Sequence, residues 1–317
     1  MSIKPTHYTA QEIRAAMSMP QCVDAMAYGF SALYNAKALV PDRVINEFPD
    51  QGATQLVMPA VLPELDLLIT KLVTVNPDNK AKELPLIHAL ITAQRASTGE
   101  VLATLDGVEI TSMRTAAASA LATRLFARKN ATVLGIVGTG VQARYHIEAV
   151  KSVLPIDKIL VRGSSDIKTA VFCEQVKSSF GIDCRPAKDF KEAQVICTCT
   201  TTSEPVLSLA DISPGTHINA VGSFRLTDRE LATDIMASSK VVIDEWGGCL
   251  AEAGDVMIPI QKGVITKEHV TGELGYWVDH IKEFKRTPED ITVFKSVGNA
   301  VQDAAAVACV LGLSESA

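Results

Sequence analysis

A glycine-rich turn of the kind that binds dinucleotides lies near the middle of the chain. The apolar run at residues 133–137 leads into Gly138, Thr139 and Gly140, and Ala143 follows three positions later. In such a turn the first glycine permits a tight bend, the second lets backbone N–H groups approach a pyrophosphate, and the small third residue lets a helix pack on the strand. The pattern predicts a nicotinamide nucleotide at a helix N-terminus. The expected contacts in this turn are Gly138, Thr139, Gly140, Val141 and Gln142.

The residues after the next expected strand, at 158–161, bear on the choice of nucleotide. Enzymes that prefer NAD place an aspartate or glutamate there to hold the ribose hydroxyls. This chain has Arg162, Gly163, Ser164 and Ser165 instead. A guanidinium beside hydroxyl groups suits a 2′-phosphate, so NADPH is the expected cofactor, with NADH as the alternative if Arg162 only stacks on adenine or faces solvent. Thr200 or Thr201, after another apolar strand, is expected at the same nucleotide-binding edge.

Three basic residues before the glycine turn are candidates for binding an anionic substrate. Lys71 interrupts the apolar segment 67–73, where an unpaired charge would be costly to bury. Arg114 is expected in the first turn of an alanine-rich helix at 111–128, where its charge opposes the helix dipole unless an anion is bound. Arg43 follows Asp42 at a strand start, and an ion pair between the two is the alternative interpretation. Guanidinium groups in this setting suit a carboxylate bound through both oxygens.

The elements that position these residues fall into two patterns. Residues 9–37 have helical apolar spacing, with Thr9 and Glu12 forming a capping box. Short strands separated by Pro, Gly, Asn and Asp follow, as in an antiparallel meander. These strands are expected at 43–48, 55–58, 66–75, 86–95 and 101–105. From residue 131 onward strands and helices alternate, as in a parallel doubly wound sheet, with further strands at 195–200, 217–221 and 241–244.

The predicted fold is therefore α/β, with a Rossmann doubly wound sheet inserted in a strand-rich α+β domain. The strand-rich domain is expected to comprise residues 1–122 and 294–317, and the nucleotide-binding domain residues 123–293. The segment 294–311 is predicted to be a helix that returns to the first domain. The meander leaves an apolar face with little chain to cover it, which predicts a homodimer through this domain.

Composition limits the other functions that the chain could have. Its 317 residues carry a net charge of −6, with no basic cluster that would suit nucleic acid. The seven cysteines are odd in number and mostly lie in apolar segments, which indicates reduced thiols, and no cluster has metal-ligand spacing. There is no basic and apolar leader and no run of ~18 apolar residues, so a cytoplasmic protein without membrane contact is expected.

An ordered series of motifs resembles the ornithine cyclodeaminase/μ-crystallin family. They are Val-Pro-Asp-Arg43-Val, Met58-Pro59, Ile-Thr-Lys71, Met113-Arg114-Thr-Ala-Ala, Gly138-Thr-Gly140-Val-Gln142-Ala, Asn219-Ala-Val-Gly222 and Thr-Val-Phe-Lys-Ser296-Val297. The resemblance implies a substrate-binding and dimerisation domain, an inserted Rossmann domain, and substrates that are amino acids or cyclic imines. It implies that Arg43, Lys71 and Arg114 bind substrate, with Lys71 and Arg114 serving the chemistry. It also implies nucleotide contacts at Val221, Gly222 and Ser296, and a substrate contact at Val297.

One position departs from the cyclodeaminases of this family. Their motif has an aspartate that moves protons between the substrate's amino groups, and Phe224 stands there in this chain. Loss of such a group costs ~10²–10⁴-fold in rate. The loop resembles the ketimine reductase branch, in which Phe224 would form an apolar wall for a small ring. The expected reaction is reduction of Δ1-pyrroline-2-carboxylate to L-proline, with Δ1-piperideine-2-carboxylate also accepted. Ornithine cyclodeaminase, an alanine or opine-type dehydrogenase, and a non-catalytic NADPH-dependent binder are the alternatives.

Two further side chains, on a strand pattern and on a helix, could also take part in chemistry. His88 lies on an apolar strand pattern, where a lone histidine is more often a core residue than a proton donor. Asp303 lies on a helix with an apolar face, and we expect it to pair with Lys71 or Arg114.

Overall fold

The computed structural model describes residues 5–313, and the chain forms two compact units. Unit 1 comprises Met1–Arg114 and Asn299–Ala317, and unit 2 comprises Thr115–Gly298. Unit 2 is thus inserted in the sequence of unit 1. The sequence predicted the first boundary between the units at 122/123, later than the observed 114/115. It predicted the second at 293/294, earlier than the observed 298/299. The first boundary lies within a helix, where the amino-acid pattern gives no sign of a junction.

Unit 1 has two helices near its start where one was predicted. α1 spans Ala10–Ala16 and α2 spans Met19–Tyr34. The two helices are separate because Ser18 caps α2. The backbone N–H of Ser18 donates to Gln21 Oε1 at 2.9 Å, and Pro20 lies in the first turn of α2. The predicted capping box at the start of α1 is confirmed, since the Thr9 N–H donates to Glu12 Oε2 at 2.9 Å.

The predicted meander is confirmed as a six-stranded sheet. The strand order is β1-β6-β5-β4-β3-β2, antiparallel from β2 to β6, with β1 added in parallel to β6. The sequence missed β1 and predicted too short a strand for β3. The strands are β1 Thr6–Tyr8, β2 Val44–Phe48, β3 Ala53–Leu62, β4 Leu67–Val75, β5 Ile87–Arg95 and β6 Val101–Asp106.

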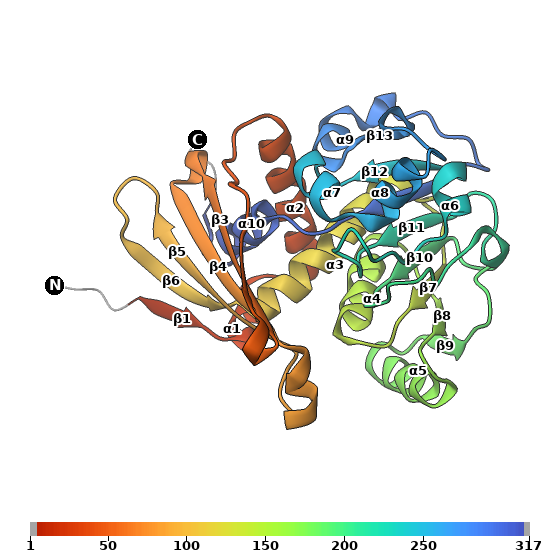
Figure 1. Ribbon diagram of the computed structural model, residues 1–317, viewed down its shortest axis with the longest axis horizontal. Coiled ribbons are helices and arrows are strands. Elements are labelled where there is room, and N and C mark those ends of the chain that lie inside the picture. The colour runs from red at the N-terminus through yellow and green to blue at the C-terminus, as the bar shows by residue number, and fades with distance from the viewer. Residues whose placement is uncertain (1–4, 314–317) are drawn as a thin grey trace. The chain divides into compact units, whose positions relative to one another are not determined.

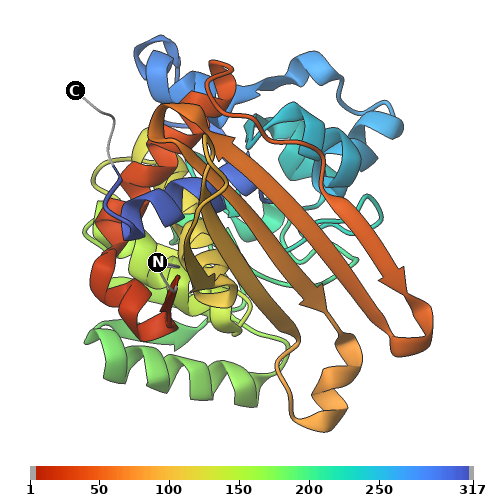
Figure 2. The same cartoon turned by 90° about the vertical axis from the view of Figure 1, so that its left-hand side faces the viewer.

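The two faces of this sheet have different surroundings. Along β4, Leu67, Ile69 and Lys71 are buried, whereas Leu72 on the other face is exposed. The helix α10 (Ala300–Val310) packs on β3, β4 and α2, which confirms that the C-terminal segment returns to this part of the chain. In Figure 1 α2 and α10 lie on one side of the strands, and Figure 2 views the sheet from its other side.

The alanine-rich helix α3 starts earlier than predicted. It spans Gly107–Phe126, because Asp106 caps it by accepting from the N–H groups of Val108 and Glu109 at 2.9 and 3.0 Å. Arg114 is therefore the eighth residue of the helix and not in its first turn. The argument from an opposed helix dipole was wrong for this residue, and its charge must be compensated by side chains.

Unit 2 is the predicted doubly wound sheet, with eight parallel strands in the order β13-β12-β14-β11-β10-β7-β8-β9. Two clusters of buried apolar side chains form its core. The strands are β7 Val133–Val137, β8 Lys158–Arg162, β9 Asp183–Pro186, β10 Val195–Thr198, β11 His217–Ala220, β12 Ser239–Ile243, β13 Val270–Glu273 and β14 Ile291–Lys295. The helices are α4 Val141–Val153, α5 Asp166–Phe180, α6 Thr233–Ser238, α7 Trp246–Glu252, α8 Gly254–Gln261 and α9 Leu274–His280.

The predicted helix at 294–311 was wrong in its first part. Phe294 and Lys295 belong to β14, and the chain passes through Gly298 at φ +85° before Asn299 caps α10. A short apolar segment fits strand and helix equally well, so only pairing with β11 and β12 decides between them. Over residues 5–313, the structure contains no helix with the length and apolar character needed to cross a membrane.

Candidate active site

The glycine turn of unit 2 forms an open anion site. Gly138 has φ +111°, and a Cβ there would lie 2.7 Å from the carbonyl oxygen of Cys199. Gly140 is the N-cap of α4 and makes no side-chain cap, so the first N–H groups of the helix point to a position that a ligand can occupy. A Cβ on Gly140 would meet no atom within 4 Å. The turn therefore has the open backbone that a pyrophosphate requires.

A cavity of about 670 Å³ adjoins this turn. Six residues of the expected nucleotide set line it, and its volume lies within the range of cofactor sites. These six are Gly138, Thr139, Gly140, Arg162, Ser164 and Thr200. The residues present thus fit a dinucleotide.

Arg162 lies at the end of β8, but its guanidinium is engaged by the protein. Nη1 donates to Asp211 Oδ1 and to the carbonyl of Lys188, both at 2.9 Å, and Nη2 donates to the carbonyl of Val206. The group also lies 5.0 Å from the ring centroid of Phe190. Sequence reasoning missed Asp211, which carries no local signal. Its carboxylate offsets the charge that was expected to meet a 2′-phosphate.

The other expected nucleotide contacts lie at the ends of β11 and β14. Val221 and Gly222 follow β11, and Ser296 follows β14 with its hydroxyl donating to Asp244 Oδ2 at 2.9 Å. The same oxygen accepts from the N–H of Val297 at 2.8 Å. Asp244 was not predicted to have this role. It holds the loop at Ser296 by several hydrogen bonds at once, which fixes the position of Val297.

Unit 1 brings the basic residues together around one carboxylate. Lys71 is 2% exposed, and its Nζ lies 2.6 Å from Oδ2 of Asp303, which is fully buried on α10. Arg114 Nε lies 3.3 Å from Asp303 Oδ1, and Arg114 Nη1 donates to Gln302 Oε1 at 2.5 Å. The expected pairing of Asp303 is confirmed with both cations. Two cations and one carboxylate give this cluster a net charge of +1, which suits an anionic ligand.

Two electrostatic influences compete at Lys71. Burial lowers its pKa, and the carboxylate of Asp303 opposes that shift. The positive charges of Arg114 and Arg43 also lower it, and the resulting pKa is about 8. Arg43, just before β2, therefore acts electrostatically on the same site. The lysine is therefore poised to exchange a proton near neutral pH.

A buried amide completes the cluster in unit 1. Gln302 Nε2 is inaccessible to solvent and makes no hydrogen bond within residues 5–313. A buried donor is costly to leave without an acceptor, so this atom is suited to a ligand oxygen. Sequence reasoning missed Gln302, although it directly precedes Asp303 in the sequence.

Two other expectations concern side chains outside this cluster. His88 is exposed on the outer face of the sheet and is not a core residue. Phe224 is 39% exposed, which argues against a purely structural core position. The guanidinium carbon of Arg225 lies 5.9 Å from the centroid of the Phe224 ring.

Comparison with known proteins agrees with this architecture. Residues 4–316 match the model of the Ornithine cyclodeaminase/mu-crystallin family. The chain belongs to this family. Among its relatives, a Δ1-pyrroline-2-carboxylate reductase of Bacillus cereus (strain ZK / E33L) is 35% identical over 303 residues, which cover 93% of this chain and 92% of the relative.

Solved structures of family members match over nearly the whole chain. The Δ1-pyrroline-2-carboxylate reductase of Thermococcus litoralis, in complex with NADH and L-proline, is 35% identical with a TM-score of 0.90, covering 98% of this chain and 100% of that chain. An archaeal alanine dehydrogenase dimer with bound NAD is 30% identical, also with a TM-score of 0.90, and the match covers 98% of this chain and 96% of that chain. The predicted class of nicotinamide-dependent oxidoreductase is confirmed at the level of the family.

The two glycines of the turn give a matched pair of substitutions. We expect Gly138→Ala to lower the free energy of unfolding by about 1–3 kcal/mol, because both its φ and the contact with Cys199 are incompatible with a side chain. Gly140→Ala should leave stability within about 0.5 kcal/mol but weaken nucleotide binding, since its methyl group would occupy the open space at the helix N-terminus. Urea unfolding and nucleotide fluorescence titration measure the two effects. Equal losses of stability would contradict this account.

Proposed function

We propose that this protein reduces Δ1-pyrroline-2-carboxylate to L-proline, with Δ1-piperideine-2-carboxylate as a second substrate. The observation that carries the proposal is the buried cluster of Lys71, Arg114 and Asp303 in a chain that also has a dinucleotide cavity. The names of the relatives from Bacillus cereus and Thermococcus litoralis support the same reaction.

The substrate requires an anion site and a proton beside its ring nitrogen. The guanidinium groups of Arg43 and Arg114 bind the carboxylate, and Gln302 Nε2 supplies a further donor. Lys71 donates a hydrogen bond to the ring nitrogen, which keeps the C=N bond protonated and electron-poor. A bound reduced nicotinamide supplies the hydride that adds to the ring carbon. Most of the catalytic effect then comes from orientation and electrostatics, because a protonated imine is already a good hydride acceptor.

The alternatives within the family are less well supported. A cyclodeaminase needs a carboxylate to move protons between two amino groups, and Phe224 cannot do this. An alanine dehydrogenase would use the same anion site with an acyclic imine, and the archaeal relative keeps that candidate open to test. A binder without turnover would not need a lysine whose pKa is about 8.

For the nucleotide, we propose that both NADPH and NADH are used, with only a modest preference for NADPH. Gly163, Ser164 and Ser165 directly follow β8 in place of a carboxylate, and Ser164 lines the cavity there. The ion pair between Arg162 and Asp211, at 2.9 Å, reduces the attraction that a free guanidinium would provide. The NADH in the Thermococcus litoralis relative is consistent with use of the nucleotide without phosphate.

Assay of the purified protein with Δ1-pyrroline-2-carboxylate and either nucleotide tests the proposal. We expect oxidation of NADPH and NADH within about tenfold of one another in kcat/KM, and L-proline as product. The six-membered imine should react more slowly by about 10-fold or more, because one methylene is worth ~1–3 kcal/mol in an apolar pocket. Absence of nucleotide oxidation, or release of ammonia from L-ornithine, would exclude the proposed reaction.

The pH profile should report the proton on Lys71. Below pH about 8 the free enzyme holds this proton, so kcat/KM should fall as pH rises through about 8. Asp303→Asn removes the charge that opposes the lowering of this pKa and should move the descending limb to lower pH. Lys71→Arg, which stays protonated, is the control in which that limb should disappear. An unchanged limb in both variants would assign the titration to another group.

We also propose that the protein is a homodimer formed through the outer face of the six-stranded sheet. Val44, Val57, Leu72 and Leu90 lie directly opposite one another on neighbouring strands. Val44 is 54% exposed, and Leu72 and Leu90 are each 39% exposed. An apolar row across a sheet is expected to be covered by a partner, and a second copy is the commonest solution. The archaeal alanine dehydrogenase relative is a dimer.

A charge in this row should dissociate the dimer. Sedimentation of the wild type is expected at twice the chain mass of 33.9 kDa, and Leu72→Glu at the mass of one chain. Like charges meeting across a two-fold axis repel, and burying them is costly. Ile167→Glu, at a 79% exposed apolar residue on α5, is the matched control and should leave the mass unchanged. A wild-type monomer at micromolar concentration would contradict the dimer.

A further inference from the structure

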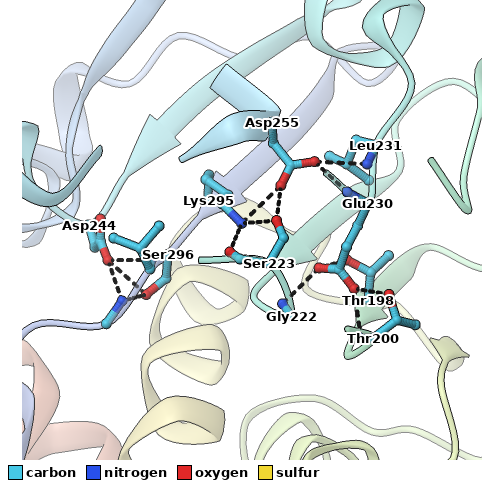
Figure 3. Close-up of polar contacts among 12 residues, drawn as sticks. Thr198, Thr200, Gly222, Ser223, Glu230, Leu231, Asp244, Asp255, Lys295 and Ser296 are labelled. Atoms are coloured by element: carbon cyan, nitrogen blue, oxygen red, sulfur yellow. Dashed lines mark hydrogen bonds and ion pairs between the residues drawn. The ribbon is translucent and has the colours of Figure 1, made fainter. Parts of the chain in front are cut away.

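A buried glutamate joins the ends of two neighbouring strands in unit 2. Glu230 is fully buried, and Oε1 accepts from both the N–H and the hydroxyl of Thr200 at 2.7 Å. Its Oε2 accepts from the hydroxyl of Thr198 at 2.8 Å and from the N–H of Gly222 at 2.7 Å. Figure 3 shows these four contacts converging on one carboxylate. The loops after β10 and β11 are thus held together by a single side chain.

The contact between these loops leaves no room for adjustment. A Cβ on Gly222 would lie 2.1 Å from the carbonyl oxygen of Thr200 and 2.5 Å from Glu230 Oε1. The backbones of the two loops therefore approach as closely as glycine allows. A change in the hydrogen bonding of Glu230 must move one loop relative to the other.

A second carboxylate fixes the backbone of Glu230 itself. Asp255 is buried at the start of α8, and its Oδ1 accepts from the N–H groups of Glu230 and Leu231, both at 2.8 Å. Its Oδ2 lies 2.9 Å from Lys295 Nζ and accepts from the hydroxyl of Ser223 at 2.7 Å. Lys295 also donates to the carbonyl oxygen of Ser223 at 2.7 Å. The ends of β10, β11 and β14 are connected through this cluster (Figure 3).

We propose that Glu230 is a positioning residue for nucleotide binding, acting through the loops at Thr200 and Gly222. Cys199 and Thr200 line the dinucleotide cavity, whereas Glu230 lies behind them and does not. The glycine turn packs on the same loop, because Gly138 approaches the carbonyl oxygen of Cys199. The inference rests on the proposed use of a nicotinamide nucleotide, but not on the identity of the imine.

The contacts of Glu230 suit its ionised form. Two of them come from backbone N–H groups, which can only donate, and the two threonine hydroxyls can donate as well. Burial raises the pKa of Glu230, and the positive charge of Lys295 opposes this shift, while the charge of Asp255 adds to it. The neighbouring lysine therefore helps to keep the carboxylate charged inside the protein.

Glu230→Gln tests the inference with little change in shape. The amide NH₂ must face the N–H of either Thr200 or Gly222, so one loop loses its backbone hydrogen bond, although a threonine hydroxyl can still accept from the amide. We expect the dissociation constant of NADPH, measured by fluorescence without substrate, to rise by about 10- to 100-fold. The KM of the imine at saturating NADPH should change by less than about threefold, since the anion site of unit 1 is untouched. Glu230→Asp, which keeps the charge, should recover part of the affinity.

Two further variants separate positioning from folding. Thr198→Val removes one hydroxyl donor with little change in shape and should weaken NADPH binding by about two- to tenfold, measured at a temperature at which the variant is fully folded. Glu273→Gln is the control, because this half-buried carboxylate accepts from the N–H of Trp246 and does not contact these loops. Loss of stability with unchanged NADPH affinity in Glu230→Gln, or an unaffected Thr198→Val, would overturn the inference. Failure of imine turnover alone would count against the proposed function and not against this role.

Discussion

A buried lysine must have a carboxylate within contact distance, and this constraint organises both units. In unit 1 the charge of Lys71 lies inside the inner face of a sheet, where water cannot stabilise it. Its partner Asp303 comes from a helix 232 residues later in the chain. The C-terminal helix must therefore pack on the N-terminal sheet for the charge of Lys71 to be tolerated. The same arrangement keeps that charge in an apolar setting, where electrostatic interactions are stronger than in water.

Unit 2 repeats this solution with a different result. Lys295 ends an inner strand of the parallel sheet and is paired with Asp255. Lys295 also donates to the hydroxyl of Ser223, and Asp255 accepts from the N–H of Glu230. Here the carboxylates outnumber the lysine, and backbone N–H groups provide the additional donors. The cluster is therefore satisfied within the protein, which suits a structural support. In unit 1 the cations outnumber the carboxylate, which suits the binding of an anion.

The features that the sequence predicted correctly depend on neighbours a few positions away. The glycine turn at Gly138 and the capping box at Thr9 are fixed by local backbone geometry. The pattern of apolar residues along β4 predicted a strand with one buried face, and Lys71 was singled out because it interrupts that pattern. The nucleotide site and the basic residues of the substrate site could be proposed on these grounds. The family resemblance added Ser296 and Val297, whose hydrogen bonds to Asp244 have no local signature.

The errors arose where distant contacts decide the structure. Phe294 and Lys295 form a strand because β11 and β12 flank them, although their sequence also suits a helix. The contacts of Arg162 were missed for the same reason, because its partner Asp211 lies 49 residues away and two backbone carbonyls also accept from its guanidinium.

The contrast between Arg162 and Arg114 shows how pairing determines what a cation can do. Arg162 donates to one carboxylate and to two backbone carbonyls, so its donors are largely satisfied by the protein. Arg114 shares Asp303 with Lys71, and its nearest amide, Gln302, has a donor that no described residue accepts. An anion entering unit 1 would complete this incomplete network, whereas a phosphate near Arg162 must compete with bonds already made. Affinity for an anion therefore depends less on the presence of an arginine than on how few of its donors the fold has already used.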